Sequence, residues 1–143
     1  MREDWATGTA DVVRSVGAVD DMPAAYAAAT VVVSAAVQAE GLQRAILEAQ
    51  AMARPVVVSD LAAGPDVVLA PPAVAEERMT GLRVPAEDEA ALAAALIRLF
   101  SLSDVARAAI GTRGRAWVLE HFDAESIERT MLALYAEVSR PVN

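Results

Sequence analysis

Two carboxylates eight positions apart, Glu40 and Glu48, are the side chains of this sequence best spaced to bind an extended polar ligand. The residues around them, 42–53, place apolar side chains at the i, i+3, i+4 spacing of a buried helical stripe. In a helix, an eight-residue separation puts the two carboxylates roughly 80° apart around the axis and about 12 Å apart along it. This geometry would suit two separate contacts to one long ligand.

The start of this helix is the second feature with chemical potential. Gly41 leaves the start open, whereas Arg54 and Pro55 mark the end because proline cannot continue the helix. At an open helix start, backbone N–H groups lack partners within the helix and the dipole is positive. We therefore expect an anion to bind between the two carboxylates.

Strands and helices alternate along the chain. The β-branched runs 12–16, 30–34 and 56–60, with a shorter one at 82–84, predict strands. Helices are expected over residues 21–29, 42–53, 87–100, about 103–121 and from 123 onward, and residues 61–80 predict an irregular connection. The alternation predicts an α/β fold, a Rossmann-like parallel sheet with helices on both faces.

Two of the expected helices carry further signals. Gly111 and Gly114 weaken the middle of the 103–121 helix and could bend it. The last helix has an apolar stripe that we expect to face inward: Ile127, Met131, Leu134, Tyr135 and Val138.

Composition excludes several kinds of site. The 143 residues suit one domain, and 55% hydrophobic with 22% charged residues indicate a folded chain. A formal net charge of −8 argues against nucleic-acid binding. All twelve basic residues are arginine, so a P-loop and a Schiff-base enzyme are excluded. One histidine and no cysteine argue against a metal site.

The stretch from Glu40 to Val56, EGLQRAILEAQAMARPV, resembles the donor-binding motif of the retaining GT-B glycosyltransferases, E-G-(F/L)-G-x-x-x-x-E-A-x-A-x-G-x-P-V. The resemblance continues through VRSVGAVDDMPAAYAAATVVVS before it and through VVVSD and TGLRVP after it, covering roughly residues 12–138. Gln43 and Ala53 occupy places where the family usually has glycine.

This resemblance implies roles for particular residues toward a UDP- or GDP-sugar donor, with no other cofactor and no metal. Glu48 would hold the ribose hydroxyls, and Glu40 would contact the transferred sugar as the catalytic residue. The implied pyrophosphate contacts are the backbone amides of Gly41, Leu42 and Gln43, and the implied nucleobase pocket is Gly17, Ala18 and Val19.

Each role has a plainer alternative. Glu40 could simply complement the helix dipole, worth about 0.3–1 kcal/mol, and Glu48 could be a solvated carboxylate. Residues 17–19 could be an ordinary strand-to-helix turn, and the Gln43 side chain stands where a ligand should approach closely. Three further polar residues suit structural roles: Ser34 (or a sugar contact), Asp60 as a cap, and His121 in the core or at the helix end.

The domain expectation is an incomplete GT-B C-terminal domain. Residues 1–11 would be a helix remnant or a disordered arm with Trp5 as an anchor, and residues 12–143 the nucleotide-sugar-binding domain. Relative to the family, the acceptor domain, the first two strands and the loop with diphosphate-neutralising cations are missing. We therefore expect no meaningful turnover by this chain alone, since the family's catalysis depends largely on stabilising the departing charge.

Two functions stay open at this stage. The first is the donor-binding part of a hexosyltransferase of cell-surface polysaccharide or lipopolysaccharide synthesis, and the second is a non-catalytic assembly module with a vestigial site. Loss of two strands would expose sheet edges, which predicts a homodimer, with exchange of the N-terminal strand as one route. The absence of an 18-residue apolar run and of a signal-peptide pattern suggests a cytoplasmic location without a transmembrane segment.

Overall fold

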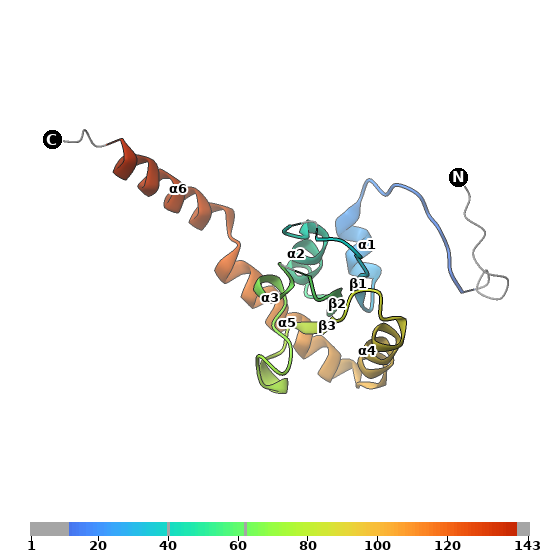
Figure 1. Ribbon diagram of the computed structural model, residues 1–143. Helices are drawn as coiled ribbons and strands as arrows, with labels where there is room; N and C mark the ends of the chain where they lie inside the picture. The colour runs from blue at the N-terminus through green and yellow to red at the C-terminus, as the bar shows by residue number, and fades with distance from the viewer. Residues whose placement is uncertain (1–11, 40, 62, 140–143) are drawn as a thin grey trace.

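The computed structural model describes residues 12–39, 41–61 and 63–139. At its centre lies a sheet of three parallel strands in the order β1-β2-β3 (Figure 1). Val33 pairs with Val57 across the first two strands, and Val57 pairs with Leu82 across the next two. The strands are β1 (Val32–Ser34), β2 (Val56–Ser59) and β3 (Gly81–Val84). The predicted α/β fold with a parallel sheet is confirmed.

One helix precedes the first strand, others fill the connections between the strands, and three follow the last strand. Four of them begin at an Asp or Ser cap whose side chain accepts a hydrogen bond from the backbone N–H three residues later: Asp21, Asp88, Ser103 and Asp123. The helices are α1 (Met22–Ala28), α2 (Arg44–Ala51), α3 (Gly64–Val67), the 3₁₀-helix η1 (Glu76–Arg78), α4 (Glu89–Ser101), α5 (Asp104–His121) and α6 (Ala124–Val138).

The central strand β2 divides the core into two clusters. Val56 and Val58 pack with α1, α2 and α3 through Tyr26, Ile46 and Val67. Val57 faces the other way and packs in a second cluster with side chains of β3, α4 and α5: Leu82, Val84, Leu99 and Ile110. Because all four residues of β2 are buried, the expected strand buried on both faces is confirmed, as are helices on both faces of the sheet.

The two glycines of α5 lie where this helix packs against the end of α2. A Cβ atom on Gly111 would lie 2.0 Å from the backbone oxygen of Ala53, and one on Gly114 would lie 3.1 Å from Oε1 of Gln50. The helix runs without interruption from Asp104 to His121. The glycines therefore permit a close approach of the two helices, a role that the sequence pattern did not indicate.

The predicted N-terminal strand, residues 12–16, is not formed. These residues are extended and exposed, with Val12 at 81% and Val16 at 68% exposure, and they run away from the sheet (Figure 1). A strand needs a partner to satisfy its backbone groups, and in this chain the described residues supply none. The expectation for residues 1–11, including Trp5, lies outside the described residues.

Two other predicted burials are also wrong. The strand at 30–34 is shorter than predicted and only half-buried, with Val33 at 41% exposure. The apolar stripe predicted to face inward on α6 is exposed along its whole length. Figure 1 shows α6 projecting from the rest of the chain, which agrees with the exposure of its stripe.

The end of α2 accounts for one of the two places where the family usually has glycine. Ala53 has φ of 55°, and its N–H donates to Gln50 O at 2.8 Å. The N–H of Arg54 donates to Ala49 O at 2.9 Å. These two bonds form a Schellman motif, whose left-handed position favours glycine.

Replacing Ala53 with glycine should therefore stabilise the chain. The left-handed conformation costs an L-residue about 1–2 kcal/mol, and glycine avoids this cost. Because glycine also makes the unfolded chain more flexible, part of the benefit is lost, and we expect the free energy of unfolding to rise by about 0.5–1 kcal/mol. Urea unfolding followed by circular dichroism measures the change. Ala29→Gly is the matched control, since Ala29 caps α1 with φ of −75° and should gain nothing. Equal effects of the two substitutions would contradict the assignment.

Candidate functional site

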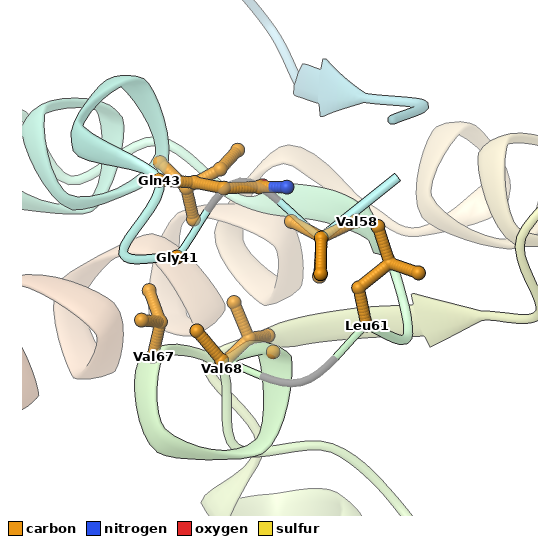
Figure 2. Close-up of a pocket in the computed structure, with 10 residues that line it drawn as sticks. Gly41, Gln43, Val58, Leu61, Val67 and Val68 are labelled. Carbon is orange, nitrogen blue, oxygen red and sulfur yellow. The ribbon is translucent and has the colours of Figure 1, made fainter. Parts of the chain in front are cut away.

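A pocket lies at the carboxyl ends of β1 and β2, the edge at which open α/β sheets bind ligands. It is shallow and narrow: about 10 Å³ can hold the centre of a water molecule, within about 300 Å³ of empty space that includes open solvent. Figure 2 shows it between the loop that precedes α2 and the segment that leads into α3. Its lining is mostly apolar and uncharged: Ala39, Gly41, Gln43, Ile46, Val58, Leu61, Ala63, Gly64, Val67 and Val68.

The start of α2 opens toward this pocket. Gln43 is the N-cap residue, and no side-chain hydrogen bond caps the helix there. The N–H groups of Ile46 and Leu47 both donate to Gln43 O, which leaves the earlier amides to be satisfied otherwise. Gly41 has φ of 70°, with nothing within 4 Å of an added Cβ, so the backbone turn itself requires glycine.

The predicted pyrophosphate residues separate into two groups. Gly41 and Gln43 line the pocket, and Figure 2 shows the Gln43 side chain reaching over it in the direction of Val58. Leu42 is 48% exposed and is not among the lining residues. Glu40, predicted to contact the transferred sugar, lies outside the described residues.

The predicted nucleobase residues do not join the pocket. Gly17, Ala18 and Val19 belong to the exposed N-terminal arm, and Gly17 has φ of 71°. None of the three lines a pocket on the described surface around α2. Because residues 12–16 form no strand, no pairing among the described strands holds this segment against the sheet.

Glu48 lies farther along α2, on the side that faces α1. The Tyr26 hydroxyl donates a hydrogen bond to Glu48 Oε2 at 3.0 Å, and Arg44 Nη2 lies 3.3 Å from Oε1. The Glu48 side chain is 43% exposed, so it is accessible and not packed in the interior. Burial, and then the bond to Glu48, raise the pKa of Tyr26 above its usual value. The hydroxyl is therefore protonated, and a donor, at neutral pH.

Sequence reasoning missed Tyr26 because it treated helix 21–29 only as a connection. The available signal was a lone tyrosine in an alanine-rich helix next to the strand-helix unit that carries Glu48. A buried tyrosine hydroxyl needs a partner, and the neighbouring helix supplies a carboxylate.

The other polar residues singled out in the sequence lie away from the pocket. Asp60, after β2, pairs with Arg83 at 3.4 Å, and Ser34 is half-buried at the end of β1. His121 is the last residue of α5 and stacks on Trp117 with ring centroids 3.6 Å apart. Of these residues, none lines the pocket at the start of α2.

Across residues 12–39, 41–61 and 63–139, no group of three metal-ligating side chains comes together. Within the same ranges, no helix is long and apolar enough to cross a membrane.

Comparison with known families decides what kind of domain carries this geometry. The sequence model of "Glycosyl transferases group 1" matches residues 1–102, more than half of the chain. The chain belongs to this family. The parallel sheet with its helices is that of a group 1 glycosyltransferase domain with the GT-B fold, and the family resemblance read from the sequence is confirmed.

Solved structures give the same assignment for this glycosyltransferase domain. Sucrose-phosphate synthase from Thermosynechococcus elongatus matches with a TM-score of 0.69 and 31% identity, over 80% of this chain and 26% of that one. A glycosyltransferase from Rickettsia africae matches in fold with a TM-score of 0.76 and 24% identity, over 87% of this chain and 31% of that one. The chain thus spans under a third of either structure. No curated protein sequence matches it significantly.

Proposed function

We propose that this domain binds the nucleotide-diphosphate sugar donor of a retaining glycosyltransferase. The observation that carries the proposal is the start of α2, which lacks a side-chain cap and opens through Gly41 and Gln43 into a pocket at the sheet's carboxyl edge. Backbone amides and a positive dipole at a helix start favour phosphate oxygens. Membership of the group 1 family supports a diphosphate donor as the anion.

We propose that the donor lies along α2, with its nucleoside at Glu48 and its sugar near Glu40. Glu48, exposed on α2 and held by Tyr26 and Arg44, would accept hydrogen bonds from the ribose hydroxyls. The diphosphate would then lie toward the helix start, and Glu40 would contact the sugar. Family resemblance supports a uridine or guanosine nucleotide, a hexose as the transferred sugar, and a product in cell-surface polysaccharide or lipopolysaccharide synthesis.

Binding without turnover is the activity we propose for this polypeptide alone. The described residues lining the pocket include no charged side chain. A departing nucleoside diphosphate needs cations to stabilise its charge, and loss of one stabilising group typically costs about 100-fold or more in rate. Donor hydrolysis or transfer by the isolated chain at rates typical of enzymes would contradict this part of the proposal.

Amide NMR tests the proposed diphosphate site. In ¹⁵N-correlated spectra, titration with UDP or inorganic pyrophosphate should shift the amides of Gly41, Leu42 and Gln43 first. Gly41→Val is the disruptive variant, since φ of 70° is strained for valine, and it should abolish these shifts. Shifts confined to α5 or α6, with residues 41–43 silent, would overturn the proposal.

A non-catalytic assembly module is the second candidate. Two observations favour it: the Gln43 side chain reaches over the pocket, and large apolar side chains are exposed on the N-terminal arm and α6. For this candidate, nucleotides leave residues 41–43 unshifted, and self-association is the detectable property.

Self-association is also expected beside donor binding. We propose a homodimer in which the arm of one copy, residues 12–16, pairs with the open edge of β1 in the other. The arm is extended, exposed and β-branched, and β1 pairs on one side only within the described residues. Light scattering coupled to gel filtration should give twice the mass of one chain.

A pair of variants makes this prediction specific. Val13→Pro should shift the protein to a monomer because proline has no N–H to donate to a neighbouring strand. Arg14→Ala keeps its N–H and should leave the dimer intact. A monomeric wild type at micromolar concentrations, or a dimer unaffected by Val13→Pro, would contradict the pairing.

A further inference from the structure

A polar cluster joins α1 to α2 beside a hollow of its own. Tyr26 Oη donates to one oxygen of the Glu48 carboxylate, and Arg44 lies against the other oxygen. The hollow is separate from the pocket at the start of α2. Its described lining is apolar except for Tyr26 and Glu48: Met22, Pro23, Tyr26, Glu48, Ala51 and Met52.

The two partners of Glu48 differ in how firmly they are placed. Tyr26 is 5% exposed, and its ring belongs to the core cluster with Ile46 and Ala49. The Arg44 side chain is 87% exposed and ends in solvent. An exposed pair of this kind contributes little to holding the carboxylate in place. The anchored donor is therefore Tyr26, which fixes the carboxylate with respect to the body of the domain.

Each carboxylate oxygen has two acceptor positions, and one bond to each leaves a second position free. A carboxylate fixed in this way presents two acceptors at a set spacing beside apolar walls. That arrangement suits a pair of neighbouring hydroxyls on a ring whose faces can rest on methionine and proline.

We propose that Tyr26 is a positioning residue for donor binding, which orients the Glu48 carboxylate to accept hydrogen bonds from the ribose hydroxyl pair. The inference rests on the proposed donor-binding function. It goes beyond that function because it assigns to α1, through Tyr26, a part in nucleotide affinity. Tyr26 itself is not placed in contact with the ligand.

The alternative is that Tyr26 serves stability only, with Glu48 satisfying a buried hydroxyl. The two roles differ in which ligand they affect. A stability role leaves the affinity of the folded protein unchanged or weakens all ligands together. A positioning role weakens ligands that carry ribose and spares those that do not.

Calorimetric titration of the full chain with UDP, GDP and inorganic pyrophosphate separates these cases. Tyr26→Phe keeps the ring and removes the donor, so we expect about fivefold weaker binding of the nucleotide that the wild type prefers. Pyrophosphate affinity should be unchanged. Adding Tyr26→Phe to Glu48→Ala should cause no further loss of nucleotide affinity, because the group that Tyr26 orients is gone.

Each remaining outcome contradicts the inference in its own way. Equal weakening of nucleotide and pyrophosphate, or the same loss from Tyr26→Phe with and without Glu48, indicates a structural role and overturns it. Unchanged nucleotide affinity in Tyr26→Phe overturns it while the proposed function stands. A wild type that binds none of the three ligands refutes the proposed function and this inference together.

Discussion

Replacing Gly111 with alanine is expected to lower the free energy of unfolding by about 3 kcal/mol, the upper range for overpacking a core. The added methyl carbon would lie 2.0 Å from Ala53 O and 2.7 Å from Ala53 C. Both are backbone atoms of the Schellman turn that ends α2, so no side chain can rotate to make room. The better helix propensity of alanine offsets only about 1 kcal/mol of the cost of this overlap.

The neighbouring glycine provides the control for this prediction. In Gly114→Ala the new methyl carbon would lie 3.1 Å from Oε1 and 3.2 Å from Cγ of the buried Gln50, a much milder contact than the one at Gly111. We expect a small change in stability there, since the propensity gain opposes the contact. Thermal unfolding followed by circular dichroism compares the two variants. A Gly111→Ala protein as stable as the wild type would show that α2 and α5 do not pack as described.

Replacing Glu48 with alanine is expected to weaken nucleotide binding at least tenfold. Hydrogen bonds to a charged group contribute about 1.5–3 kcal/mol each, and 1.4 kcal/mol corresponds to a factor of ten in affinity. The loss should appear in calorimetric titration with UDP or GDP and be absent with inorganic pyrophosphate, which has no ribose.

Glu125→Ala is the matched control for Glu48→Ala. Glu125 lies on α6 and pairs with Arg129, four residues later, at 3.9 Å. Glu48 likewise pairs with an arginine four residues away, but its partner Arg44 comes before it in the sequence. Its removal should leave nucleotide affinity unchanged. If the Glu125 and Glu48 variants bind nucleotide as tightly as the wild type, the ribose role of Glu48 is wrong.

Local signals predicted much of the fold. Asp21 and Asp123 begin helices because a carboxylate can cap the first turn whatever lies around it. Residues 56–59 form a strand because a short β-branched run suits a position buried on both faces. The predictions that failed depended on a partner. Among the described residues, the run 12–16 has strand composition but no neighbouring strand, and the apolar stripe on α6 is exposed.

In the candidate site, too, some residues could be placed from a local pattern, whereas other contacts depend on how the helices pack. Gly41 and Gln43 could be placed at the start of a helix from sequence, because the motif fixes their distance from the helical stripe. The contact between Tyr26 and Glu48 spans 22 positions and depends on how α1 packs on α2, which no local pattern encodes. The close approach at Gly111 likewise depends on where α5 crosses the end of α2.

Saturation-transfer NMR of the wild-type chain with a panel of UDP- and GDP-sugars tests the central claim most directly. We expect transfer to the ribose and sugar protons of at least one donor, and its loss in Glu48→Ala. Silence across the whole panel, with the chain shown to be folded, would contradict donor binding.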